Sequence, residues 1–388
     1  MRARTAWQQL LLLETFAMAF VSTRTRCLMY LTGQHNVVPA DPDLIADISH
    51  VLLAFMNSAV FNVDQTPTDW PLFTNVDEVR QKFPQGTKVM VAIGGWGDSK
   101  GFEEAAKDEA SRARWARQVA AMIRHTGADG VDIDWEYPGG NRNDYKIIPN
   151  EKRRWEIEAF VQLLQDIRSA IGTDKLLSVA VPGLERDLMA YTPETVPRIS
   201  QAVDFINVMA YDLMNRRDTV VKHHSGVADT RDALQRYVQR GAPPRMLNLG
   251  LGYYVKAFMT QECGPDPIGC PTQLLEDPKT GADLGRTAGF SWHDETPKEL
   301  VQSFRRALDD GFYDDDGSYG YWDGQEKRWW TFDTPLVIER KLHQVLAPMG
   351  YGGVFAWGLG EDAPKFANLA ATINALRAVQ SNMTKDEL

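Results

Sequence analysis

The 388-residue sequence lacks an excess of basic side chains, with 42 Lys and Arg against 52 Asp and Glu and a formal charge of −10. Nucleic acids and anionic membranes bind basic surfaces, so this charge argues against both as partners. Apart from an apolar stretch near the N-terminus, the chain has no run of about 18 apolar residues, and no further membrane span is expected. The composition therefore favours a neutral partner such as a sugar.

Cysteine is also scarce, and three residues are too few for a disulfide scaffold. Cys263 and Cys270 enclose a turn-rich segment of Gly and Pro, which predicts a local disulfide. Cys27 begins an apolar run and is expected to be a buried free thiol. Low-complexity linkers and internal repeats are missing as well, so a separate carbohydrate-binding module is not expected.

The two ends of the chain carry targeting signals. Arginines, an apolar stretch over residues 10–20 and small residues at 17–19 predict a secretory signal in residues 1–25. The final Lys-Asp-Glu-Leu matches the address that the retrieval receptor of the endoplasmic reticulum reads. It closes a tail over residues 381–388, which includes a glycosylation sequon at Asn382. The protein is thus expected in the lumen of the endoplasmic reticulum, with secretion as the alternative.

Eight short β-rich stretches alternate with amphipathic patterns of helical period. The expected strands are residues 27–31, 50–55, 88–93, 130–136, 177–182, 204–211, 246–254 and 352–357. Helical patterns cover residues 110–125, 151–171, 229–240, 335–346 and 364–379. This alternation predicts an α/β fold, a (β/α)₈ TIM barrel over residues 26–380, with an open doubly wound sheet as the alternative. The long gap after the seventh strand predicts a small insertion subdomain over residues 256–333, between strand 7 and helix 7.

The expected fourth strand carries three acidic residues on one face. Side chains alternate along a strand, so Asp132, Asp134 and Glu136 point one way, and Val131, Ile133 and Trp135 point the other. Like charges at this spacing repel, and burial disfavours ionisation further. The arrangement therefore raises at least one carboxyl pKa, as a general acid near neutral pH requires. Glu136 ends the strand, where barrel active sites lie.

Two other interpretations of the acidic strand stay open, a solvated edge strand and a site for a hard metal ion. An edge strand would not account for the apolar opposite face. Adjacent His223 and His224 lack the spacing of a zinc site, and no metal is assigned to them. The pattern favours catalysis.

The run from Asp129 to Pro138 resembles the signature of family 18 chitinases, in which spaced aspartates end in a glutamate. Other segments resemble the same family in the third strand, at residues 93–96, and in the sixth, at residues 209–212. The resemblance spans most of the chain. One departure is Ala92, where the family commonly has a serine that hydrogen-bonds the first inward aspartate. Tyr30 is then expected to make that contact alone, which leaves the pH optimum open.

By this resemblance, Glu136 is the catalytic acid, Asp134 orients the acetamido group of the substrate, and Asp132 shares a proton with Asp134. Tyr211 is expected to hold the attacking carbonyl oxygen. The resemblance further assigns substrate binding to Tyr30, Phe55, Gly95, Trp96, Tyr137, Met209, Asp212, Tyr254 and Trp357. No cofactor and no metal is implied.

The expected function is hydrolysis of β-1,4-N-acetylglucosamine linkages in chitin or chito-oligosaccharides, with endo-type attack. The resemblance implies a substrate-assisted reaction, in which the sugar supplies its own nucleophile in place of a second carboxylate. Two alternatives are an endo-β-N-acetylglucosaminidase that acts on N-glycan cores, and a chitinase-like lectin without activity. Glu136 argues against the lectin, because such proteins typically lack this glutamate.

Overall fold

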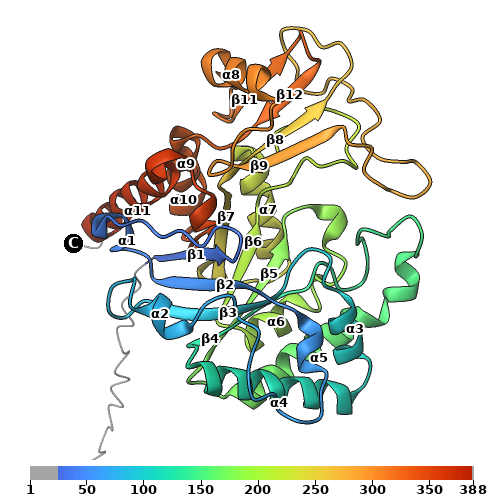
Figure 1. Ribbon diagram of the computed structural model, residues 1–388, viewed down its shortest axis with the longest axis vertical. Helices are drawn as coiled ribbons and strands as arrows, with labels where there is room; N and C mark the ends of the chain where they lie inside the picture. The colour runs from blue at the N-terminus through green and yellow to red at the C-terminus, as the bar shows by residue number, and fades with distance from the viewer. Residues whose placement is uncertain (1–24, 387–388) are drawn as a thin grey trace, which may run out of the picture.

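The computed structural model describes residues 25–386, and eight parallel strands close into a barrel at its centre (Figure 1). The barrel strands are β1 (Arg26–Thr32), β2 (His50–Met56), β3 (Lys88–Gly94), β4 (Gly130–Asp134), β5 (Leu176–Pro182), β6 (Phe205–Met209), β7 (Leu247–Gly252) and β13 (Gly353–Trp357). Their order around the barrel is β1-β13-β7-β6-β5-β4-β3-β2. The (β/α)₈ fold is confirmed, and each of the eight strands overlaps its predicted range, although β4, β6 and β7 end two residues earlier than predicted.

Helices cover the outside of the barrel, and their ends follow local sequence signals. In α4 (Glu109–Thr126), the Asp108 side chain caps the N-terminus by accepting from the backbone N–H of Ser111 at 2.8 Å, and Gly127 ends the helix at φ 71°. The other helices of this layer are α1 (Pro42–Ile45), α2 (Val76–Arg80), α3 (Lys100–Ala106), α5 (Trp155–Ile171), α6 (Val196–Ala202), α7 (Val227–Gln239), α9 (Pro335–Lys341), α10 (Ala347–Met349) and α11 (Ala367–Asp386). A π-helical turn, Leu342–Leu346, joins α9 to α10.

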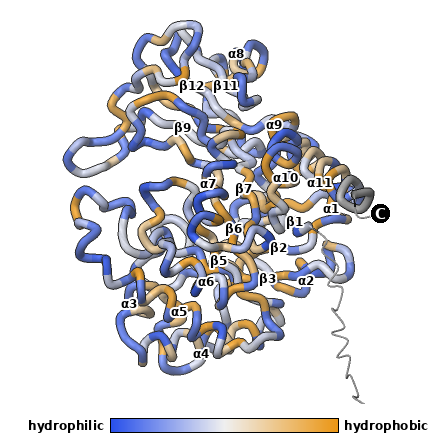
Figure 2. Tube along the Cα trace, turned by 180° about the vertical axis from the view of Figure 1, so that it is seen from behind, coloured by the Kyte–Doolittle hydropathy of each residue, from blue (hydrophilic) through white to orange (hydrophobic). Residues whose placement is uncertain are grey.

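The apolar core lies between the barrel and its helices. Along β4 and just beyond it, Val131, Ile133 and Trp135 are fully buried, and Trp135 stacks on Phe102 of α3 at a centroid distance of 5.3 Å. Figure 2 shows hydrophobic residues along the barrel strands and the helices around them, and mostly hydrophilic residues in the outer loops. The apolar side chains of β4 thus point outward, towards the helices. Because side chains alternate along a strand, the acidic side chains of β4 point into the barrel, as predicted.

A second sheet forms the subdomain that follows β7 (Figure 1). Its strands are β8 (Tyr254–Met259), β9 (Thr287–Ser291), β10 (Phe312–Tyr313), β11 (Tyr319–Asp323) and β12 (Arg328–Thr331), in the order β10-β11-β12-β8-β9. Helix α8 (Val301–Asp310) packs on it through Phe304 and Trp330, whose centroids lie 5.1 Å apart. Where one seventh strand was expected up to residue 254, the chain leaves the barrel after Gly252 and starts the subdomain sheet at Tyr254.

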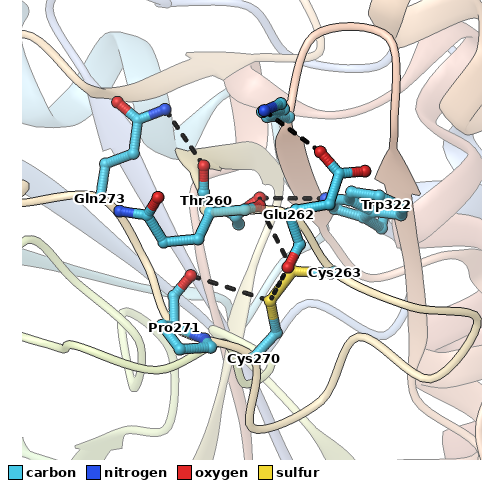
Figure 3. The surroundings of a disulfide bond; sticks show 9 residues. Thr260, Glu262, Cys263, Cys270, Pro271, Gln273 and Trp322 are labelled. Atoms are coloured by element: carbon cyan, nitrogen blue, oxygen red, sulfur yellow. Dashed lines mark hydrogen bonds and ion pairs between the residues drawn. A yellow bond between two sulfur atoms is a disulfide. The ribbon is translucent and has the colours of Figure 1, made fainter.

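The subdomain carries the predicted disulfide between Cys263 and Cys270, whose Cα atoms lie 5.7 Å apart (Figure 3). The loop that it closes pairs with the segment after β6, since the backbone N–H of Val221 donates to the Cys270 carbonyl at 2.8 Å. The disulfide thus fixes the loop where it contacts the barrel. Cys27 is buried, as expected.

The predicted targeting segments fall mostly outside the described part of the chain. Residues 1–24 and 387–388 lie beyond it, so the secretory signal and the retrieval signal stay predictions. Helix α11 continues through most of the tail expected over residues 381–388, including Asn382. Among residues 25–386, no helix combines the length and the apolar character that a membrane crossing requires.

Candidate active site

A cavity of about 980 Å³ opens at the carboxyl ends of the barrel strands, beside the subdomain. Twelve of the thirteen residues predicted to act on or bind the substrate line this one cavity. They are Tyr30, Phe55, Gly95, Trp96, Asp134, Glu136, Tyr137, Met209, Tyr211, Asp212, Tyr254 and Trp357. The thirteenth, Asp132, is buried beneath them at 0% exposure. The sequence pattern therefore brings together residues on or just after β1, β2, β3, β4, β6 and β13, and one from the subdomain.

Asp132 is held by three neutral donors in the centre of the barrel. The Tyr30 hydroxyl donates to its Oδ2 at 2.7 Å, and the Ser178 hydroxyl and the Asn207 amide donate to its Oδ1 at 2.5 and 3.2 Å. Burial raises the pKa of Asp132 to about 6, and these hydrogen bonds limit the rise.

The expectation that Tyr30 alone would hold Asp132 is wrong. In the barrel register, Asp132 lies beside Ala92 on β3 and beside Ser178 on β5. A hydroxyl that the family commonly places on the β3 side is here supplied from β5. Ser178, on the other side of β4, thus supplies the hydroxyl that Ala92 lacks.

Asp134 lies one layer above Asp132 and is less well satisfied. Its Oδ1 atom is buried and has no hydrogen-bond partner among the described residues. Burial raises the pKa of Asp134 well above its usual range, and the charges of Glu136 and Asp132 add to the rise. An unpaired buried acceptor is costly, so this oxygen is positioned to accept a hydrogen from a bound ligand.

Glu136 lies just beyond β4, which ends at Asp134 instead of continuing to Glu136 as predicted. The strand ends where its pairing ends: the last pair with β3 is Asp134 with Gly94, at which β3 also ends, and the last pair with β5 is Ile133 with Val179, although β5 continues to Pro182. Burial raises the pKa of Glu136 to about 8, and the charges of Asp212 and Asp187 contribute. A glutamate with such a pKa is protonated at neutral pH, and Glu136 lines the cavity.

Asp212 has the opposite electrostatic environment. It accepts from the Tyr254 hydroxyl at 2.9 Å and pairs with Lys256, whose Nζ lies 3.0 Å from the same oxygen. Although burial opposes ionisation, Lys256 and the nearby His224 hold the pKa of Asp212 below its usual range. The site thus combines a carboxylic acid at Glu136 with a carboxylate at Asp212.

Aromatic rings form the floor and one side of the cavity. Trp357 stacks on Phe55 at a centroid distance of 5.3 Å and contacts Tyr30 at 5.6 Å. Gly95, at φ 91°, allows this packing, because a Cβ atom there would lie 2.6 Å from the Phe55 ring. Trp96 is 52% exposed near Tyr137. Flat apolar surfaces of this kind suit the faces of pyranose rings.

Among the residues of the site that were missed from the sequence, four contact or lie near its acidic side chains: Ser178, Asn207, Asp187 and Lys256. Ser178 and Asn207 are inward polar residues within predicted strands, and the same alternation that identifies Asp132 could have found them. Asp187, whose Oδ1 is buried without a hydrogen-bond partner among the described residues, lies in the 3-10 turn Glu185–Asp187 after β5, which is too short to give a periodic signal. Lys256 was assigned to the insertion, yet its side chain lines the cavity.

Curated chitinases are similar to the chain over most of its length. The chain is 26% identical over 360 residues to the endochitinase of Manduca sexta, covering 84% of this chain and 60% of that protein. It is 27% identical over 354 residues to chitinase 1 of Aphanocladium album, covering 83% and 77%. The chain thus spans about three fifths of the length of the Manduca protein.

Solved structures share the fold. A chitinase from Rhizomucor miehei superposes with a TM-score of 0.70 at 18% identity, covering 90% of this chain and 99% of that one. The Ostrinia furnacalis group IV chitinase in complex with allosamidin has a TM-score of 0.69 at 21% identity, covering 92% and 99%. The sequence profile of the glycosyl hydrolases family 18 matches residues 26–362, most of the chain. The chain therefore belongs to the glycosyl hydrolases family 18 and is a glycoside hydrolase.

Proposed function

We propose that the protein hydrolyses β-1,4-N-acetylglucosamine linkages in chitin or chito-oligosaccharides by a retaining, substrate-assisted mechanism. The observation that carries the proposal is the contrast between neighbouring acids: Glu136 bears a proton at the cavity surface, and Asp134 offers a buried oxygen without a partner in the described chain. An N–H group of a 2-acetamido sugar is a donor that would satisfy this oxygen. The two curated relatives are an endochitinase and a chitinase, which supports the same substrate class.

In the first step, Glu136 gives its proton to the glycosidic oxygen while the acetamido carbonyl oxygen attacks the anomeric carbon of the same sugar. The bond to the leaving sugar breaks, and a cyclic oxazolinium ion forms. Asp134 accepts the acetamido N–H and stabilises the positive charge of the ring. Tyr211, which lines the cavity, orients the attacking carbonyl oxygen.

In the second step, water attacks the anomeric carbon, and the bond from that carbon to the acetamido oxygen breaks, which reopens the ring and restores the acetamido group. The Glu136 carboxylate takes a proton of that water. The configuration at the anomeric carbon is retained. Asp132, held by its three donors, shares a proton with Asp134 through the cycle. Trp357 supports the reacting sugar from below, and Asp212 with Tyr254 adds polar contacts at the side of the cavity.

Replacing Glu136 by glutamine tests the assignment, because the change removes the transferable proton and keeps the shape. We expect hydrolysis of chitotetraose to fall by at least about 10²-fold, with the affinity for the tetrasaccharide retained. Glu185→Gln is the matched control, since Glu185 is exposed and pairs with Arg240. Full activity of Glu136→Gln would contradict the role of Glu136.

A side-by-side substrate test separates the remaining candidate functions. Chitotetraose, chitohexaose and a high-mannose glycopeptide are offered to the unmodified enzyme, and the anomers of early products are followed by NMR. Retention on the chito-oligosaccharides supports the proposal. Cleavage of the glycopeptide alone would assign the N-glycan core as substrate, and binding without turnover would identify a lectin.

A further inference from the structure

The direction in which a sugar chain crosses the cavity follows from the barrel order. Three strands separate β4 from β13 on either side, so the two strands stand opposite each other. In the proposed function, Glu136 after β4 protonates the oxygen of the leaving sugar, and Trp357 at the end of β13 supports the reacting sugar. The leaving sugars therefore extend past β4, and sugars on the non-reducing side extend past β13.

Beyond β13, three segments of the chain meet across this path. β1 and β7 flank β13 in the barrel, and the loop after β1 contacts the subdomain that follows β7. The Nε2 atom of His35 lies 2.8 Å from Asp294, in the turn after β9, and its Nδ1 atom lies 3.3 Å from Glu361, in the loop after β13. We call His35, Asp294 and Glu361 the end wall. All three line the cavity.

Close packing supports the end wall from behind. A Cβ atom at Gly360 would lie 1.8 Å from the His35 carbonyl oxygen, so the loops after β13 and β1 are in direct contact. Thr32 donates to Glu361 at 2.8 Å, and Ser291 donates to Asp294 at 3.0 Å. Each side chain of the end wall is thus held by more than one contact.

Glu361 also keeps an unused hydrogen-bonding atom. Its side chain is 7% exposed, and its Oε2 atom is buried without a hydrogen-bond partner among residues 25–386. The other oxygen accepts from Thr32. A buried acceptor at the end of a sugar path matches the free hydroxyl that a terminal sugar carries and an internal sugar does not.

The opposite end of the cavity is different. Trp96, after β3, is about half exposed and offers its ring to solvent beside Tyr137. The subdomain does contact the loop after β4, where the Tyr145 hydroxyl donates to Glu276 at 2.5 Å. That contact does not cover Trp96, which stays 52% exposed.

We propose that the end wall makes this enzyme recognise the non-reducing end of its substrate and release a product of fixed length from that end. The inference rests on the proposed function for the direction of the chain. The sequence predicts endo-type attack on internal linkages. Under this proposal, cleavage is restricted to the linkage at a fixed distance from the non-reducing end. A chain whose terminal sugar is extended would meet His35 and Asp294 before its reacting sugar reached Trp357.

Chitohexaose labelled at its reducing end tests the product pattern. We expect the unmodified enzyme to give one initial labelled product, shorter by a constant number of sugars, and chitopentaose to lose the same number. The variants His35→Ala and Asp294→Ala open the end wall and should add several further products. Tyr145→Phe breaks a contact of the subdomain at the other end and should keep the single product. A ladder of initial labelled products from the unmodified enzyme would overturn the proposal.

A binding test separates this inference from the reaction. Chitohexaose and an analogue extended by a benzyl ether on the 4-hydroxyl of its non-reducing terminal sugar, which leaves no free 4-hydroxyl at that end, are titrated into Glu136→Gln by calorimetry. The end wall predicts at least about tenfold weaker binding of the extended analogue, and equal affinities after Asp294→Ala. Equal affinities for Glu136→Gln itself would overturn the proposal. Because no turnover is needed, an enzyme inactive on chitohexaose would contradict the proposed function and leave this comparison valid.

Discussion

Replacing Ser178 by alanine removes the donor that compensates for Ala92. The Ser178 hydroxyl lies 2.5 Å from Oδ1 of Asp132, at a position with 0% exposure, so water has no ready access to the oxygen that loses its partner. A hydrogen bond to a charged group contributes about 1.5–3 kcal/mol, and one pKa unit corresponds to about 1.4 kcal/mol. The pKa of Asp132, now raised by burial to about 6, should therefore rise by about one to two more.

Two measurements follow the change. The acid limb of kcat/KM on chitotetraose should move to higher pH, by up to the same amount, because the carboxyl groups titrate as a coupled set. Stability should also change with pH. When the pKa of an aspartate is higher in the folded than in the unfolded state, the free energy of unfolding falls as the pH rises above the unfolded-state pKa. The variant should therefore lose about 1.5–3 kcal/mol of unfolding free energy at pH 8, and less at pH 4.

A second substitution provides the control. Ala92→Ser in the Ser178→Ala background places a hydroxyl on the other register neighbour of Asp132, and it should return the acid limb towards its original position. A Ser178→Ala enzyme with an unchanged acid limb and an unchanged pH dependence of unfolding would refute the reasoning. Equal effects of Ser178→Ala at pH 4 and pH 8 would indicate a packing defect instead.

Three further predictions concern stability. Burial raises the pKa of Glu136 from 4.5 to about 8, and this shift costs stability that grows as the pH rises between those two values. Glu136→Gln removes the cost, so it should raise the melting temperature more at pH 8 than at pH 4. An equal gain at both pH values would contradict this. Lys341→Met leaves Asp333 buried without its ammonium partner, 2.6 Å away, and should lower the free energy of unfolding in urea by about 3–5 kcal/mol; no loss would refute it. The Cys263→Ser/Cys270→Ser double variant frees a short loop and should lose about 2–3 kcal/mol in the same assay, and full stability would contradict it.

Local patterns were enough to predict most of the barrel. Alternation along residues 130–136 separated Trp135 from the three acids, and the structure places these two sets on opposite faces of β4. Strand ends were less accurate, because they depend on neighbouring strands. β4 ends at Asp134, where its pairing with β3 ends. The residue types at Trp135 and Glu136 give no local signal for that end.

Contacts between distant segments could not be predicted in the same way. Ser178 follows Asp132 by 46 positions, and only the barrel register makes them neighbours. Asp294 follows His35 by 259 positions, in a turn of the subdomain without helical or strand periodicity. A pattern within one segment reports which face a side chain takes, and it does not report which other loop that face will meet.

The inward acidic side chains along and just after β4 form two layers, which differ in how completely the protein hydrogen-bonds their oxygens. The lower layer has a structural role and the upper layer a chemical one. Asp132 receives donors from β1, β5 and β6, so its burial is supported by the protein alone. Asp134, one layer higher, keeps an oxygen without a partner in the described chain, and Glu136 above it meets the charges of Asp212 and Asp187. A fold that satisfied the upper layer as fully would be more stable, and it would leave no acceptor for an acetamido group and no reason for Glu136 to keep its proton. The proposed chemistry therefore needs an upper layer whose hydrogen bonding is incomplete. The donors around Asp132 hold β4 in place although the layer above it lacks such partners.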